Sequence, residues 1–179
     1  MALDRAGRLE AALQHHREAR RLGADSAEGR YELANTLQRA GRLEEAIVEY
    51  EAALRLRPDY AEAHNNLGSA LQQLGRPAEA MERFRAAVRL KPGYADARYY
   101  LGNLLFGAGR VDEAVAEYRE ALRAEPRDAA VRNNLGLALE TLGRSREAEA
   151  EYREALRLRP DLTQASEGLA RVRRRGATE

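Results

Sequence analysis

Prolines recur along this chain at intervals of 34 residues, at Pro58, Pro92, Pro126 and Pro160. A glycine–arginine pair keeps the same interval and begins at Gly7-Arg8. A fixed interval of this length indicates one supersecondary unit that repeats, and each unit buries its apolar face against its neighbours. The interval therefore predicts an array without a single central core, and such an array presents an extended surface suited to binding.

Each repeat contains two helices joined by a tight turn. In the second repeat, Leu67 and Leu71 recur at helical spacing, and Gly75 stands where a left-handed residue ends a helix. Pro77 suits the first turn of the next helix, because its missing N–H has no partner there in any case. Pro92 then prevents that helix from continuing.

Small and large residues alternate within each helix pair. In the third repeat, Gly102 of the first helix and Ala114 of the second predict a close approach of the two backbones. Tyr118 supplies a large side chain that fills the space beside them. Because these residue types recur in phase, we expect every pair to pack in the same way.

The phase of the leucines, glycines, alanines, aromatics and prolines resembles that of the tetratricopeptide repeat (TPR) family. The resemblance covers residues 27–162 as four full repeats. It implies an all-α fold, a right-handed α-solenoid of antiparallel helix pairs forming a superhelix. The segments expected are a partial N-terminal repeat at 1–26, full repeats at 27–60, 61–94, 95–128 and 129–162, and a C-terminal capping helix with a tail at 163–179.

One position departs from the family pattern, because the large first-helix residue that is often tryptophan is replaced. The replacements are Arg30, His64, Arg98 and Arg132. We expect the arginine stems to pack on apolar surface with their charged heads in water. The many glutamates indicate solvated helix faces paired with arginine, and Glu51 with Arg55, four residues on, is one expected pair.

The resemblance implies that the second, fifth, sixth, ninth and twelfth residues of each repeat line the concave face of the superhelix. The residues expected to bind a peptide there are Tyr31, Asn35, Asn65, Asn66, Ser69, Tyr99, Tyr100, Asn103, Phe106, Asn133 and Asn134. Glu32 and Gln38 fall at lining positions of the same kind.

Asparagine presents a donor and an acceptor in one plane, so it can bind a peptide backbone whatever the side chains. Asn66 and Asn134 occupy the sixth place, where asparagines of the repeat region of O-GlcNAc transferase form a ladder that binds peptide; Glu32 and Tyr100 interrupt the ladder here. The alternative is that such asparagines face solvent or bond across adjacent helices. The carboxylate clamp of chaperone-binding relatives is disfavoured, because Tyr31 stands where its first lysine would lie.

The third repeat carries the least ordinary lining, with Tyr99, Tyr100, Asn103 and Phe106 close together. An exposed aromatic patch usually marks contact with a partner. We expect this cluster to lie in the middle of the groove.

Composition disfavours several classes of partner. Lys and Arg number 30 against 29 Asp and Glu, so we expect neither nucleic acid nor a membrane surface as partner. The sequence contains no cysteine, and its first residues lack the apolar stretch of a signal peptide or membrane span. We therefore expect a cytoplasmic protein without a cofactor.

No pattern of a catalytic or metal site stands out. His15 has Glu18 one turn on, which is a weak metal signal, and the sequence lacks a phosphate-binding glycine loop and a nucleophile elbow. We expect neither enzymatic activity nor a bound metal. The arginines from Arg171 to Arg175 fit a solvating cap better than contact with RNA or an acidic protein.

The sequence therefore predicts a non-catalytic scaffold that binds a peptide segment of a partner protein in its groove. One alternative is self-assembly through the incomplete first repeat, where Leu3, Leu9 and Leu13 lack a complete partner. The other is that the chain forms the protein-binding arm of a larger enzyme, such as a glycosyltransferase.

Overall fold

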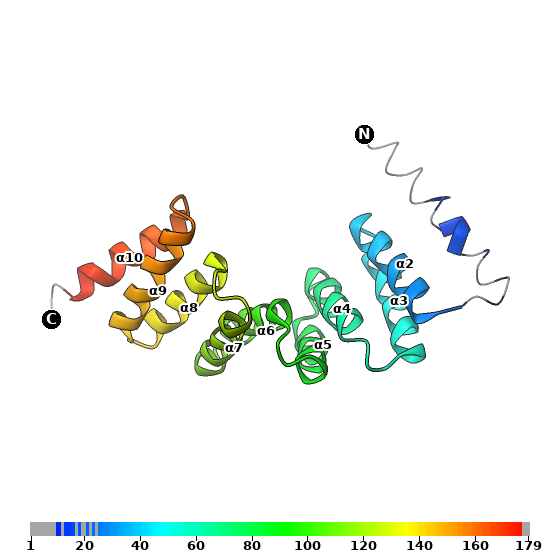
Figure 1. Ribbon diagram of the computed structural model, residues 1–179, viewed down its shortest axis with the longest axis horizontal. Helices are drawn as coiled ribbons and strands as arrows, with labels where there is room; N and C mark the ends of the chain where they lie inside the picture. Colours follow the sequence, from blue (N-terminus) through cyan, green and yellow to red (C-terminus); the bar gives the residue numbers. More distant parts are fainter. Residues whose placement is uncertain are drawn as a thin grey trace. The chain divides into compact units, whose positions relative to one another are not determined.

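The computed structural model describes residues 10–11, 13–16, 18, 21, 23 and 25–176, and from Ala27 onward the described chain is built of helices joined by short turns (Figure 1). The helices are α2 (Ala27–Arg39), α3 (Leu43–Leu56), α4 (Ala61–Gln73), α5 (Pro77–Leu90), α6 (Ala95–Gly107), α7 (Val111–Ala124), α8 (Ala129–Thr141), α9 (Ser145–Leu158) and α10 (Thr163–Gly176).

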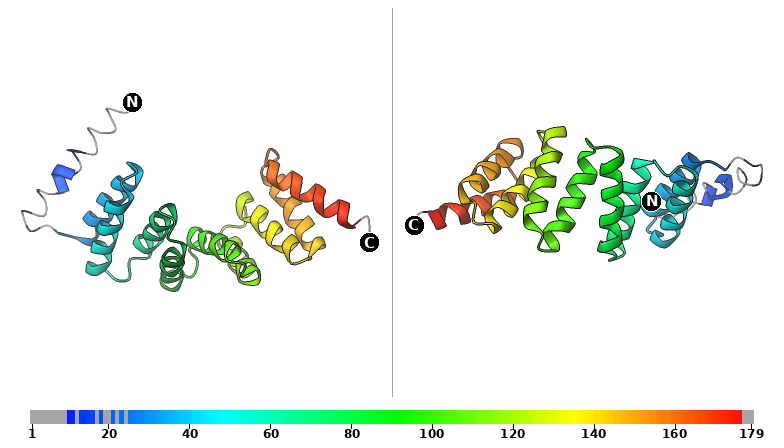
Figure 2. Two further views of the ribbon diagram at one scale, coloured as in Figure 1. Left: turned by 180° about the vertical axis from the view of Figure 1, so that it is seen from behind. Right: turned by 90° about the horizontal axis from the view of Figure 1, so that it is seen from below.

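The chain divides into two compact units, Met1–Pro92 and Gly93–Glu179. In the first unit, α2 packs against α3 and α4 against α5, with α3 also contacting α4. In the second unit, α6 pairs with α7 and α8 with α9, and α10 covers both α9 and α8. Consecutive helices run antiparallel in every pair, as both views of Figure 2 show, so the predicted all-helical fold of helix pairs is confirmed.

The turn inside each pair follows from one glycine. Gly75 has a φ of +71°, which a side chain would strain, and its N–H donates to the carbonyl of Gln72 at 3.0 Å. The N–H of Arg76 reaches back to the carbonyl of Leu71, also at 3.0 Å. These two bonds satisfy carbonyls at the end of α4. Pro77 then begins α5, as the sequence predicts.

The small residue of each first helix makes room for an aromatic ring. A Cβ atom added to Gly102 would lie 2.6 Å from a ring carbon of Tyr118, and its three nearest atoms all belong to that ring. The ring is 1% exposed, so it has no open space to move into. The missing side chain of Gly102 therefore makes room for the Tyr118 ring. The sequence had suggested instead that Gly102 lets its helix backbone approach the second helix near Ala114.

The expectation that the arginines at the family's tryptophan position hold their heads in water is wrong. Each guanidinium pairs with a glutamate 19 residues further on, on the second helix of the same repeat. The pairs are Arg30–Glu49 at 2.6 Å, Arg98–Glu117 at 2.6 Å and Arg132–Glu151 at 2.8 Å. The arginine side chains are only 12–18% exposed, so an ion pair replaces the water that the charges would otherwise need.

Candidate functional site

A network of hydrogen bonds joins the first helices of two repeats in the first unit. The Asn66 amide nitrogen donates to the Tyr31 hydroxyl at 3.0 Å and to Asn35 Oδ1 at 2.8 Å. Asn35 Oδ1 also accepts from the Tyr50 hydroxyl at 2.6 Å, and the Asn65 amide donates to Asn66 Oδ1 at 3.1 Å. We call these five residues the first tyrosine–asparagine network.

The second unit contains the same arrangement 68 residues later. Asn134 donates to Tyr99 Oη at 3.4 Å and to Asn103 Oδ1 at 2.9 Å, and Tyr118 Oη donates to Asn103 Oδ1 at 2.8 Å. The Asn133 amide donates to Asn134 Oδ1 at 3.1 Å. This second tyrosine–asparagine network shows that the recurring polar unit comprises two repeats and not one.

The tyrosines of the second helices hold the asparagines in place. Burial raises the pKa of Tyr118, so its hydroxyl stays protonated and acts as a donor. Tyr50 has a second acceptor, Gln38 Oε1 at 2.7 Å, and its single proton serves one of the two at a time. At the place of Gln38 the second unit carries Phe106, which has no acceptor to offer.

The two kinds of asparagine differ in what they leave available. Asn66 and Asn134 use both donors and one acceptor inside their networks. Asn35 and Asn103 accept two bonds through Oδ1, while among the described residues no acceptor bonds either Nδ2 group. Neither Nδ2 is among the buried atoms that lack a partner, so both nitrogens reach solvent. The available donors therefore lie at the ninth place of the repeat.

A cavity of about 400 Å³ opens over the first network, between α2 and α4. Its lining consists of four residues at predicted groove positions and one arginine: Glu32, Asn35, Gln38, Asn66 and Arg39. Ser69 lies beside it and accepts a bond from Gln38 Nε2 at 3.3 Å. The structure therefore brings predicted lining residues of two successive repeats around one hollow.

In the second unit, aromatic rings lie beside the network. Tyr99 and Tyr100 have ring centroids 5.3 Å apart, and the Tyr99 ring also lies 6.4 Å from that of Tyr118. Tyr100 and Phe106 are partly exposed, and burial raises the pKa of Tyr100.

Two of the predicted binding asparagines are closed to a ligand at their oxygen. Asn133 Oδ1 is buried without a hydrogen-bond partner, as is its counterpart Asn65 Oδ1, so neither oxygen is open to a ligand.

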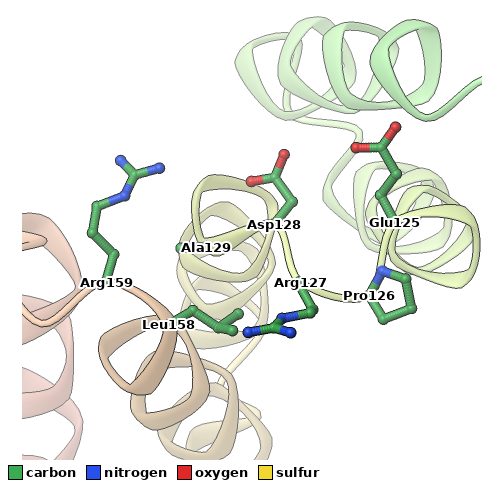
Figure 3. A pocket seen from close by; sticks show the side chains of 7 residues that line it. All are labelled: Glu125, Pro126, Arg127, Asp128, Ala129, Leu158 and Arg159. Atoms are coloured by element: carbon green, nitrogen blue, oxygen red, sulfur yellow. The ribbon is translucent and has the colours of Figure 1, made fainter.

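A hollow of about 630 Å³ in the second unit lies away from the second tyrosine–asparagine network. It is formed by the loop between α7 and α8 and by the end of α9, and its lining residues are Glu125, Pro126, Arg127, Asp128, Ala129, Leu158 and Arg159 (Figure 3). Asp128 caps α8 by accepting from the N–H groups of Ala130 at 2.7 Å and Val131 at 3.0 Å. None of the predicted binding residues lines this hollow, and the Asp128 carboxylate in its lining already caps α8.

Sequence profiles identify the repeats directly. A TPR repeat profile matches residues 39–75, and a tetratricopeptide repeat profile matches residues 67–129, 99–163 and 134–176. The chain belongs to the tetratricopeptide repeat family. Proteins with these repeats mediate protein–protein interactions, and the repeats themselves typically form non-catalytic scaffolds.

Solved structures of other TPR proteins superpose on most of this chain. The crystal structure of MamA has a TM-score of 0.80 at 25% identity and covers 89% of this chain and 93% of its own. YrrB, described as a TPR protein with an unusual peptide-binding site, has a TM-score of 0.78 at 25% identity and covers 92% and 85%. MamA from Desulfovibrio magneticus RS-1, at 22% identity, has a TM-score of 0.77 and covers 88% and 89%. Among curated proteins, none matches this chain.

The remaining expectations from the sequence concern membrane spans, metal ions and self-assembly. No helix among the described residues is long and apolar enough to cross a membrane, and the described part contains no group of three or more side chains suited to a metal ion. Leu3 and Leu9, on which the prediction of self-assembly depends, lie outside the described residues, whereas Leu13 is 8% exposed.

The sequence interpretation missed the part played by the second-helix tyrosines. Tyr118 and its equivalents were expected only to fill space between the helices, yet the hydroxyls of Tyr50 and Tyr118 anchor the ninth-place asparagines. A signal was present, because an asparagine precedes a tyrosine by 15 residues in the first and third repeats and in neither of the others.

Proposed function

We propose that this chain is a scaffold that binds an extended peptide segment of a partner protein, with one binding site on each unit. The main-chain carbonyl groups of the peptide accept hydrogen bonds from Nδ2 of Asn35 in the first unit and of Asn103 in the second. The observation that carries the proposal is that both amides are fixed through their oxygen and keep their donors available.

Fixing one end of an amide prepares the other end for a ligand. Asn35 Oδ1 accepts two bonds, so the amide plane cannot rotate without breaking them. A binding group held in one orientation loses little conformational entropy when a ligand arrives. A peptide carbonyl is a suitable acceptor in any sequence, and this chemistry favours recognition of the backbone.

The aromatic side chains extend each site. Tyr31 and Tyr99 are held by the sixth-place asparagines, and they offer rigid apolar area beside the free donors. In the second unit, Tyr100 and Phe106 add partly exposed rings. The similarity to YrrB, a TPR protein with an unusual peptide-binding site, supports a peptide as the ligand class.

The test replaces both donors while keeping both acceptors. Peptides are first selected from a random display library against the intact chain, and the affinity of the best one is measured by calorimetry. Asn35→Asp with Asn103→Asp keeps the oxygen that each tyrosine needs, but places an oxygen opposite the peptide carbonyl. Each lost hydrogen bond is worth about 0.5–1.5 kcal/mol and tenfold in affinity corresponds to about 1.4 kcal/mol, so we expect roughly a tenfold loss or more.

The matched control is Gln14→Glu with Gln164→Glu, which makes the same amide-to-carboxylate change once in each unit at exposed positions. Its affinity should equal that of the parent. Equal affinity of the Asn35→Asp, Asn103→Asp variant would refute the proposed donors. Failure to select any peptide from the library would refute the peptide-binding function itself.

A further inference from the structure

The second repeat breaks a charge pattern that the other three repeats keep. Each of the others pairs an arginine of its first helix with a glutamate of its second, as in Arg132–Glu151 at 2.8 Å. The second repeat carries His64 and Arg83 at these two places. A carboxylate is therefore replaced by a guanidinium, and the cation beside it by a smaller ring.

The equivalent position in the second unit shows what normally fills this space. There Arg132 donates through Nε and Nη2 to the carbonyl oxygen of Pro126, at 3.2 and 2.9 Å, and through Nη1 to Glu151. In the first unit, His64 Nε2 lies 3.1 Å from the carbonyl oxygen of Pro58. The imidazole thus keeps the backbone contact but lacks the second arm that reaches the second helix.

A cavity of about 380 Å³ lies where α3, α4 and α5 meet. Its lining residues are Glu51, Leu54, Arg55, Pro58, His64 and Arg83, and we call it the His64–Arg83 cavity. Among the described residues neither Arg55 nor Arg83 forms an ion pair within 4.0 Å. The Glu51–Arg55 pair expected from the sequence is thus not formed, and two guanidinium groups face this cavity with one carboxylate.

The electrostatics around His64 are consistent with an excess of positive charge. Burial lowers the pKa of His64 below its ordinary value of 6.5, the Pro58 carbonyl opposes this effect, and the charges of Arg83 and Arg89 lower the pKa further. Glu51 of α3 is the one carboxylate in the cavity lining. The second ring nitrogen, Nδ1, is buried without a hydrogen-bond partner.

We propose that the His64–Arg83 cavity binds an oxyanion, a carboxylate or a phosphate group, through Arg83 and Arg55. The bound anion takes the role that the Glu151 carboxylate plays in the fourth repeat, and it adds a second negative charge beside Glu51 to balance the two guanidinium groups of the lining. Guanidinium groups suit this ligand because their donors match the spacing of carboxylate and phosphate oxygens. The cavity lies apart from the first tyrosine–asparagine network and shares no residue with it.

The first experiment follows the histidine by NMR. The intact chain is titrated with inorganic phosphate or with acetate in a low-salt buffer free of other oxyanions. The His64 resonance is assigned by comparison with the variant His64→Gln, in which it is missing. An anion favours the imidazolium, so it should raise the pKa of His64 toward 6.5, and binding should tighten as the pH falls through the raised pKa. Saturation by phosphate alone would indicate a phosphate group, and saturation by acetate a carboxylate such as an acidic side chain.

The second experiment rebuilds the common ion pair. The double variant His64→Arg, Arg83→Glu places in the second repeat the two residues that the other repeats carry, so it should fold at least as well as the parent. A ligand that binds only the folded state raises the melting temperature, so phosphate or acetate should raise Tm of the parent and leave that of the double variant unchanged. The single variant Arg83→Glu keeps His64 as a probe and should lose the anion-dependent pKa shift.

Two results would overturn the proposal. One is the absence of any saturable change of the His64 resonance with either anion, while the His15 and His16 resonances serve as internal references. The other is an equal anion-dependent rise of Tm in the parent and in the His64→Arg, Arg83→Glu variant, which would place the effect elsewhere on the chain.

Discussion

Replacing the ninth-place asparagine by alanine should cost more stability in the second unit than in the first. Asn103 Oδ1 accepts the proton of the Tyr118 hydroxyl at 2.8 Å, and Tyr118 is only 1% exposed. The variant Asn103→Ala leaves that hydroxyl without an acceptor in a buried place. An unsatisfied buried donor costs about 1–3 kcal/mol.

In the first unit the same change has a substitute partner. Tyr50 also lies 2.7 Å from Gln38 Oε1, so in Asn35→Ala its proton can pass to that oxygen. The expected cost is then the loss of an ordinary hydrogen bond, about 1 kcal/mol. The two variants should therefore differ by up to about 2 kcal/mol in free energy of unfolding, with Asn103→Ala the less stable.

Urea denaturation followed by circular dichroism measures the difference, and amide hydrogen exchange assigns it to a unit, because repeat arrays can unfold in parts. A second change sharpens the test. Tyr118→Phe removes the stranded hydroxyl and should recover most of the loss in the Asn103→Ala background. The reasoning fails if Asn35→Ala is as costly as Asn103→Ala, or if Tyr118→Phe gives no recovery.

Two further predictions concern packing and the last helix of the second unit. Gly102→Ala should be less stable than Gly107→Ala by about 1–3 kcal/mol, because both gain helix propensity but only the first presses a methyl group into the Tyr118 ring; equal unfolding midpoints would contradict this. Burial alone would raise the pKa of Glu140, but hydrogen bonds from Arg171 and a buried tyrosine bring it below 4.5. The ionised carboxylate therefore stabilises the fold above that pH, so Glu140→Gln should be destabilising at pH 7, and the difference from the parent should shrink as the pH falls through the lowered pKa. An equal difference in urea midpoints at neutral and at acid pH would exclude this role.

Much of the fold could be predicted from the sequence, because the interactions that form it are local or recur at a fixed interval. Gly75 and Pro77 specify a turn through backbone geometry alone, and the structure has that turn. The phase of the leucines and aromatics likewise specifies which face of each helix is buried. These features require only the sequence of one repeat and the knowledge that the neighbouring repeats resemble it.

The candidate sites depend on contacts between helices that the sequence does not rank. Asn35, Asn66 and Asn103 have the same amide group, and only their neighbours in space decide which donors are used and which stay available. The heads of Arg98 and its equivalents were expected in water for the same reason, because a partner 19 residues away is recognised only once two helices lie side by side.

The sequence by itself determined that this chain is an array of helix pairs, since a recurring interval constrains every unit at once. The tertiary structure decided which polar groups are satisfied within the protein, because a hydrogen bond between residues 15 or 31 positions apart depends on side-chain geometry. It also placed His64 and Arg83 side by side in the lining of one cavity, because they lie on two helices that pack together.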